Sequence, residues 1–205
     1  MGYRTIAQAV TASFIEKKSE FIATLVPVQT ADAAIACIEE VRKANRKARH
    51  NVYAYILREN HMTRYSDDGE PQGTAGVPVL NVLQKQNLTD VCCVVTRYFG
   101  GILLGGGGLV RAYSHSAALA VEAAQIQTKI SCHPVTLKMA YSLYGKVSYQ
   151  LPQLPILQQN ADFGDTVTLS LLMIELTNGE ISIQVGEQLD ADFAEVADRL
   201  PPELL

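Results

Sequence analysis

The passage from residue 91 to residue 113 constrains the fold more than any other part of this chain. VCCVVT (91–96) is an unbroken apolar run, which is typical of a strand buried on both faces of a sheet. Six glycines follow between residues 100 and 108, and the segment 109–124 has the apolar spacing of a helix. The sequence therefore predicts a buried strand, a glycine-rich loop and a helix packed through Leu109, Tyr113, Ser116, Ala120 and Ala123.

The glycine-rich loop has two interpretations. Glycines let a ligand approach the backbone and a helix N-terminus favours an anion, which Arg97 and Arg111 could clamp. The chain has neither the GxxxxGK[ST] nor the GxGxxG signature of nucleotide binding. The alternative is close packing of strand, loop and helix, with the arginines paired to Asp68 or Glu70.

A second segment, SDDGEPQGTAG (66–76), carries three carboxylates and three glycines within eleven residues. Paired carboxylates could perform acid–base chemistry or bind Mg²⁺. In the alternative interpretation the segment is a tight turn, in which Asp67 or Asp68 accepts hydrogen bonds from the backbone and the glycines adopt positive φ. Spacing alone favours the turn.

A third segment is basic. Thr30 is expected to cap a helix whose buried side contains Ala34, Cys37, Ile38, Val41 and Ala48. Cations cover its opposite side, namely Arg42, Lys43, Arg46, Lys47 and Arg49. Their excess predicts a phosphate-binding stripe. The alternative is a solvated helix end, because cations suit a helix C-terminus and Lys43 can pair with Glu39.

Charge divides the chain in two. Residues 1–130 carry 14 lysines and arginines against 11 acidic residues, whereas residues 131–205 carry 3 against 10, within a net charge of −4. This reversal predicts two domains, 1–130 and 131–205, with a linker near 124–134. No apolar run approaches the ~18–20 residues that span a bilayer, and early charges exclude a signal peptide, so we expect a cytoplasmic protein without a membrane partner. Cysteines and histidines lack metal-ligand spacing, so no metal is expected.

The remaining elements follow from apolar patterning. Strands are expected over 3–13, 19–28 and 51–57, a polar loop over 58–76 and a short helix over 77–86. The second half predicts a strand over 134–141, a helix over 145–159, strands 165–176 and 180–186 joined at Asn178–Gly179, and a last helix from Asp190. That β-α-β-β-α order suggests a ferredoxin-like sheet with both helices on one face.

DDGEPQGTAG (67–76) followed by VTRYFGGILLGGGGLVRAY (95–113) resembles the paired signature of the IMPACT family. The resemblance covers roughly residues 1–125, and the remainder resembles the small C-terminal domain of bacterial members. Leu103 stands where many relatives have lysine. The resemblance implies an α+β protein with a first domain like domain 2 of ribosomal protein S5 and a ferredoxin-like second domain like the last domain of elongation factor G. It also implies a link to translation, since eukaryotic relatives restrain a kinase that senses amino-acid starvation.

These features predict a non-enzymatic, translation-associated regulator that binds RNA or a ribosomal surface through the five cations of 42–49. The alternative is an enzyme or small-ligand protein that acts on a phosphorylated compound at a cluster of Asp68, Glu70, Arg97 and Arg111. A protein–protein adaptor is the third interpretation. No catalytic residue, cofactor or metal ligand is assigned, and the oligomeric state is left open. The expected ligand-binding or motif residues are Asp68, Gly69, Glu70, Gly73, Thr74, Arg97, Tyr98, Gly100, Gly101, Gly105, Gly107, Gly108 and Arg111.

Overall fold

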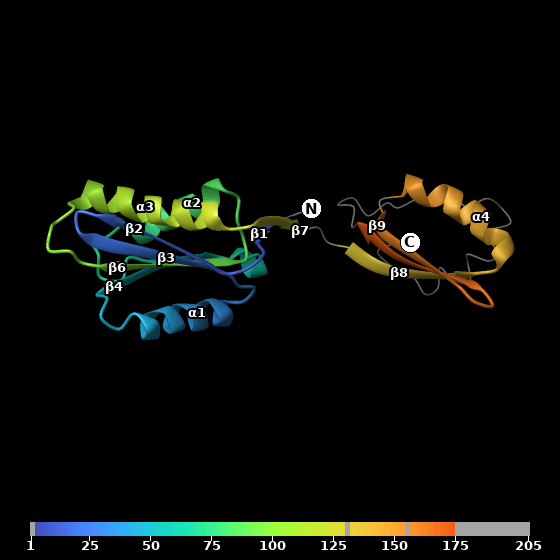
Figure 1. Cartoon of the computed structure of the whole chain (residues 1–205), viewed down its shortest axis with the longest axis horizontal. Helices are drawn as coiled ribbons and strands as arrows, with labels where there is room; N and C mark the ends of the chain where they lie inside the picture. The colour runs from blue at the N-terminus through green and yellow to red at the C-terminus, as the bar shows by residue number, and fades with distance from the viewer. Residues whose placement is uncertain (1–2, 130–131, 155, 175–205) are drawn as a thin grey trace. The chain divides into compact units, whose positions relative to one another are not determined.

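The structure is a computed structural model that describes residues 3–129, 132–154 and 156–174 (Figure 1). The described residues form two compact units, of which the first is Tyr3–Lys129 and the second follows it in the chain. Both units combine helices with strands, so the α+β class is confirmed. No helix within the described ranges is long and apolar enough to cross a membrane.

A five-stranded sheet forms the centre of the first unit. Its order is β2-β3-β6-β4-β5, and every neighbouring pair is antiparallel. The strands are β2 (Val10–Glu16), β3 (Ser19–Pro27), β4 (His50–Ile56), β5 (Thr63–Ser66) and β6 (Val91–Tyr98). The central strand β6 is buried from Val91 to Arg97, which confirms the interpretation of its apolar run.

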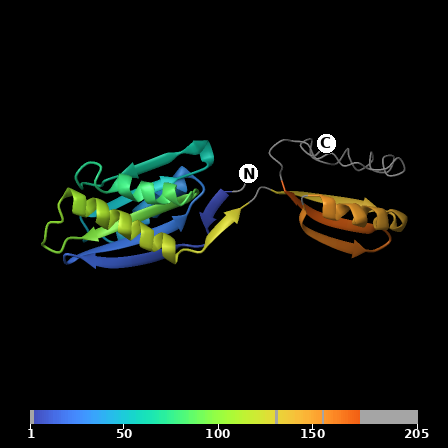
Figure 2. The same cartoon turned by 90° about the horizontal axis from the view of Figure 1, so that it is seen from above.

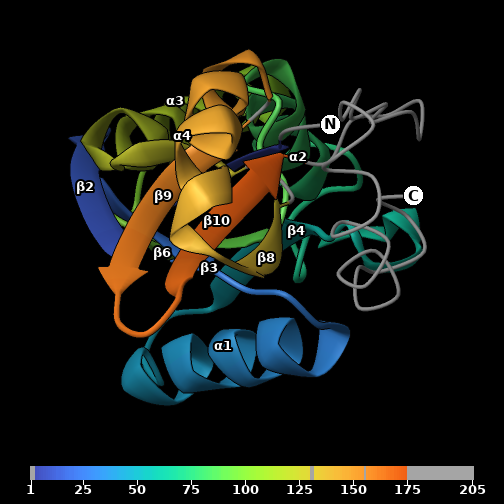
Figure 3. The ribbon, with the colours of Figure 1, turned by 90° about the vertical axis from the view of Figure 1, so that its right-hand side faces the viewer.

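Helices cover both faces of this sheet. α1 (Ala31–Ala44) lies on one face, and α2 (Gly76–Lys85) and α3 (Gly106–Ala123) lie on the other, as Figures 1 and 3 show. Thr30 caps α1 as predicted, since its Oγ accepts a hydrogen bond from Ala33 N–H at 3.2 Å. α2 and α3 also contact each other over the sheet.

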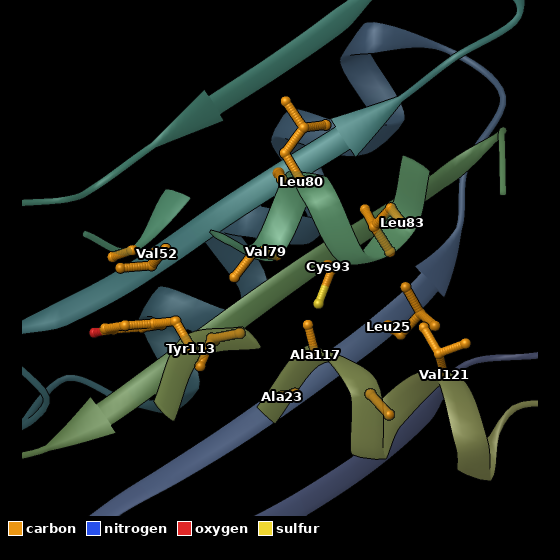
Figure 4. Packing of buried hydrophobic residues seen from close by; sticks show 14 of the residues in the cluster. Ala23, Leu25, Val52, Val79, Leu80, Leu83, Cys93, Tyr113, Ala117 and Val121 are labelled. Atoms are coloured by element: carbon orange, nitrogen blue, oxygen red, sulfur yellow. The ribbon is translucent and has the colours of Figure 1, made fainter. Parts of the chain in front are cut away.

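Two apolar cores result, one on each side of the sheet. The larger core packs α2 and α3 against the sheet and includes Cys93 and Tyr113 (Figure 4). The smaller core packs α1 against the opposite face and includes Cys37 and Cys92. The adjacent Cys92 and Cys93 therefore point to opposite faces, as the two-residue repeat of a strand requires.

A second, two-stranded sheet corrects two expectations. β1 (Tyr3–Ile6) pairs antiparallel with β7 (Ile126–Lys129), and the two strands lie side by side in Figure 2. The expected strand 3–13 was wrong, because the chain leaves β1 at Ile6 and begins β2 at Val10. The expected linker 124–134 was also wrong in part, because residues 126–129 belong to β7.

The segment expected as a loop over 58–76 contains regular structure. It holds a 3₁₀ turn, η1 (Glu59–His61), and the edge strand β5, which pairs with β4. The helix boundaries also shift. α1 ends at Ala44, so Ala48 lies beyond it, and Ala123 in the last turn of α3 is exposed.

The second unit is a three-stranded antiparallel sheet with one described α-helix. Its strands β8 (Cys132–Met139), β9 (Ile156–Phe163) and β10 (Val167–Ile174) lie in the order β8-β10-β9. α4 (Tyr141–Gln150) and the 3₁₀ turn η2 (Leu151–Gln153) connect β8 to β9. Val147 and Leu151 pack against Val167 and Leu169 of β10.

The expected helix over 145–159 was wrong. α4 begins at Tyr141 and ends at Gln150, and β9 begins at Ile156. Pro152 lies at the start of η2. A proline is tolerated there because the first N–H groups of a helix have no acceptor inside the helix, so the missing N–H of proline costs no hydrogen bond. The expected strand 180–186, its Asn178–Gly179 hairpin and the helix from Asp190 lie outside the described residues.

Candidate functional site

The segments singled out from the sequence meet at one end of the first unit, on the left in Figure 1. Tyr98 Oη, at the end of β6, donates a hydrogen bond to Asn45 Oδ1, directly after α1, at 2.8 Å. Arg42 Nη2 donates to Asp68 Oδ1 at 2.8 Å. Long-range contacts thus join the end of α1 to the acidic segment and to the end of β6, where the glycine-rich segment begins.

The acidic segment is a turn that is held by backbone hydrogen bonds to Asp67. Asp67 Oδ1 accepts hydrogen bonds from the N–H groups of Ala75 and Gly76 at 3.0 and 2.8 Å, and Oδ2 accepts one from Gly73 at 2.8 Å. These bonds satisfy N–H groups at the start of α2 that have no partner inside the helix. Gly69 and Gly73 have φ values of +85° and +75°. The turn interpretation of this segment is confirmed.

Asp68 ties the turn to α1 and β4. Its Oδ2 accepts a 2.6 Å hydrogen bond from Asn51 N–H, while its Oδ1 faces the Arg42 guanidinium. Arg42 also pairs with Glu39 at 2.9 Å. Arg42 was expected to contact a ligand phosphate, but its guanidinium is already held by two carboxylates of this unit.

Glu70 is the buried centre of the site. Arg97 Nη1 donates to Glu70 Oε1 at 2.6 Å, and Tyr113 Oη donates to the same oxygen at 2.8 Å. The Arg97 guanidinium lies 5.5 Å from the ring centres of both Phe21 and Phe99. Burial and the negative charge of Glu70 raise the pKa of the Tyr113 hydroxyl.

The expected four-residue ligand cluster is not what the structure shows. Asp68 faces Arg42, and Glu70 and Arg97 are buried together with side chains 4% and 6% exposed. Arg111 is exposed on α3 and takes no part in that pair. The structure therefore agrees with the packing interpretation for Arg97, whose charge is neutralised by Glu70 rather than presented to a ligand.

The glycines of the second motif divide into two groups. Gly100 approaches the β2–β3 turn so closely that a Cβ atom there would lie 2.0 Å from the backbone of Lys18. Gly101 and Gly105 have φ values of +84° and +75°, so they need the conformational freedom of glycine. The other three, residues 106–108, form the first turn of α3, so the loop is shorter than expected. Thr74 of the first motif is the nearest residue to a Cβ built on Gly106.

The basic segment comprises the exposed cations Lys43, Arg46, Lys47 and Arg49. Because α1 ends at Ala44, only Arg42 and Lys43 of the expected stripe are helical, and the other three cations lie in the turn that follows. Across the described residues, no ion pair involves any of the four. Their charges are therefore free to meet an external anion.

Sequence reasoning missed the residues on the other side of the glycine-rich segment. Lys17 and Lys18 form the β2–β3 turn with φ values of +46° and +64°. Lys17 lines a pocket together with Arg111 and His115 of α3. The polar turn is visible in the sequence, but nothing local indicates that it lies beside α3, because this contact depends on the pairing of β2 with β3.

Comparisons with known proteins show which family this chain resembles. The family model described as the Impact N-terminal domain matches residues 17–121. The IMPACT family member YvyE of Bacillus subtilis (strain 168) is 38% identical over 199 residues, which cover 91% of this chain and 92% of the relative. YigZ of Escherichia coli (strain K12) is 34% identical over 174 residues, or 83% and 85% of the two chains.

A solved structure described as the crystal structure of a hypothetical protein is also similar. Its TM-score is 0.63 at 32% sequence identity, and the match covers 97% of this chain and 92% of that one. The family model spans both motif segments that meet at the end of the first unit, and the relatives extend over most of the chain. The chain belongs to the IMPACT family.

Proposed function

We propose that this protein is a non-enzymatic, cytoplasmic regulator associated with translation, and that its first unit binds RNA or a ribosomal surface. The contacts are made by the basic segment, Lys43, Arg46, Lys47 and Arg49. A link to translation is what the family resemblance implies, and the basic segment supplies the chemistry for it.

One observation carries the proposal. Four exposed cations lie within seven residues, and no described acidic side chain pairs with them. Arg42, directly before them, is held by Glu39 and Asp68, so these two carboxylates are already occupied. Cations left unpaired at this density attract a polyanion, and the phosphate backbone of RNA is such a polyanion.

We take the two domains as 1–130, like domain 2 of ribosomal protein S5, and 131–205, like the last domain of elongation factor G. The order β8-α4-β9-β10 supports the second assignment, because a ferredoxin-like fold begins with the same β-α-β-β order. A fold alone does not fix a function, so the basic segment remains the main argument.

The test measures binding of a single-stranded RNA oligomer by fluorescence anisotropy and of ribosomes by co-sedimentation, each at several salt concentrations. In the test variant Lys43, Arg46, Lys47 and Arg49 are replaced by glutamine. We expect weaker binding, with a slope of log affinity against log salt that is shallower by roughly 0.7 for each lost contact to a single strand.

A matched control removes four other exposed cations, by changing Lys85, Lys129, Lys138 and Lys146 to glutamine. It alters the net charge by the same amount but leaves the basic segment intact, so RNA affinity should stay close to that of the wild type. An equal loss of RNA affinity in both variants would show that the net charge of the protein, and not the basic segment, determines binding. No binding of the wild type to either partner would refute the proposal.

A further inference from the structure

A pocket of about 250 Å³ lies between the end of β2 and the first half of α3. Lys17, from the β2–β3 turn, and Arg111, from α3, both line it, and His115 lies one helical turn beyond Arg111 on the same helix. None of these side chains belongs to the basic segment or to the buried Glu70–Arg97 pair. The pocket is therefore a separate feature of the same end of the unit.

The charge of this pocket is positive. Lys17 and Arg111 form no ion pair within the described part of the chain. Glu16 is the acidic residue in the lining, and its single charge opposes two fixed cations. α3 begins at Gly106, so the partial positive charge of its N-terminal turn has the same sign as these cations. Unpaired cations in a concave site favour an anion.

The shape of the pocket restricts the size of that anion. Gly108 lines it without a side chain, and Phe14 and His115 form a wall, with their rings in edge contact at 4.7 Å between centres. The volume of about 250 Å³ is below the range of roughly 300–1,000 Å³ that holds a whole drug-sized ligand. It suits one compact anionic group. A guanidinium and an ammonium that line the same pocket can both donate hydrogen bonds to the oxygens of a phosphate.

We propose that this pocket binds a phosphate group, held by Arg111 and Lys17 with His115 beside them. The inference goes beyond the proposed function, because it uses a different surface and different residues. The phosphate could come from a free phosphorylated small molecule or from the backbone of an RNA, and the chemistry of recognition is the same for both.

The test titrates the full-length protein with inorganic phosphate, adenosine monophosphate and a short single-stranded RNA, using isothermal titration calorimetry. Arg111→Gln and Lys17→Gln are the test variants. Both side chains are exposed and form no ion pair with another described residue, so their loss should leave the fold intact. We expect each to weaken phosphate binding about tenfold, because each removes a charge-assisted hydrogen bond. Arg111→Lys should recover part of the affinity.

The control is Lys85→Gln, which removes one exposed cation from α2 outside this pocket and should leave the affinity within about twofold of the wild type. Binding of adenosine monophosphate as well as inorganic phosphate would identify a small-molecule site, and binding of RNA alone would identify a backbone contact. Unchanged affinity in Arg111→Gln and Lys17→Gln, or no binding of any probe, would overturn the proposal. The variant in which the four cations of the basic segment are replaced by glutamine should still bind phosphate. A failure of this proposal can therefore be distinguished from a failure of the proposed function.

Discussion

Arg97 Nη1 donates a 2.6 Å hydrogen bond to Glu70 Oε1, and less than a tenth of either side chain is exposed. The pair joins β6, the central strand, to the acidic turn, and Tyr113 adds α3 through its bond to the same oxygen. One carboxylate thus connects three parts of the unit that are far apart in sequence. The two motifs of this family are joined to each other by this buried interaction.

Removing the negative charge at this position should destabilise the protein. Glu70→Gln leaves the Arg97 guanidinium buried without a counter-charge, so we expect the free energy of unfolding to fall by about 3–5 kcal/mol. Urea denaturation followed by circular dichroism measures it. Glu39→Gln is the control, because Glu39 pairs with Arg42 at the surface, where an ion pair contributes about 1 kcal/mol or less. If both variants lost the same free energy of unfolding, the burial of the Glu70–Arg97 pair would not make it more important for stability than a surface ion pair.

A double variant separates charge from packing. Glu70→Gln combined with Arg97→Met removes both charges, so the uncompensated guanidinium of the single variant is gone. We expect the double variant to be more stable than Glu70→Gln alone, measured in the same urea titration. If it is less stable, the stacking of Arg97 on Phe21 and Phe99 matters more than its charge.

Two glycines of the second motif should respond oppositely to alanine. At Gly100 a Cβ would lie 2.0 Å from the backbone of Lys18, so Gly100→Ala should destabilise the unit by about 3 kcal/mol as the turn is pushed away. Gly107 lies inside α3, and its nearest neighbour would be Arg111 Nη1 at 3.7 Å. Gly107→Ala should raise stability by up to about 1 kcal/mol, because alanine favours a helix. Thermal unfolding of both variants checks the two signs, and a stable Gly100→Ala would contradict the close approach.

Much of the sheet could be predicted from local patterns. The apolar run of β6 and the alternation of β3 gave their positions, because a strand in the centre of a sheet has a strong signal on one or both faces. The edge strand β5 has only four residues, none of them fully buried, so its sequence resembles a polar loop. The helix expected over 145–159 was wrong because that range includes Pro152, which lies at the start of a 3₁₀ turn and not inside an α-helix.

The candidate site was harder to predict, because its geometry depends on pairings across the fold. The sequence indicated which residues matter in the acidic turn, since Asp and Gly have local roles there. It left open whether Arg97 would face Asp68 or Glu70, and it did not indicate that Arg42 would face Asp68. That choice depends on the position of α1 on one face of the sheet and α3 on the other. That Lys17 and Arg111 line one pocket also depends on the fold, through the pairing of β2 with β3.

The first domain should fold without the second. Among the described residues, its two cores are formed by residues of Tyr3–Lys129, and the core of the second unit is formed by residues from Val135 to Leu171. We expect a fragment of residues 1–130 to unfold in one cooperative urea transition. A fragment of residues 1–124 lacks β7, so β1 loses the strand that it pairs with. The stability of this fragment should be lower than that of 1–130 by at least about 1 kcal/mol. A 1–130 fragment without a cooperative transition would contradict separable domains.

Alkaline pH should destabilise the first unit through its buried thiols. Cys93 lies between Leu25 and Ala54 on neighbouring strands, and burial raises its pKa to about 12. An unfolded cysteine ionises near pH 8.5, so between that pH and 12 the unfolded state releases a proton that the folded state keeps. The contribution of the Cys93 thiol to stability is therefore fully present below pH 8.5 and is lost as the pH rises from 8.5 toward 12.

Between pH 8 and pH 10, the ionisation of Cys93 in the unfolded state should lower the free energy of unfolding by about 2 kcal/mol. Urea denaturation at each of the two pH values measures this difference. Burial and the contact with Glu70 raise the pKa of Tyr113. The interaction with the Cys37 thiol, together with burial, raises the pKa of Cys92. Both groups therefore add to the decrease in stability in the same direction. Cys93→Ala removes one of these groups. Although the cavity lowers its stability at every pH, its loss between pH 8 and pH 10 should be smaller than that of the wild type. Equal losses in the two proteins would show that this thiol ionises as readily in the folded state as in the unfolded state.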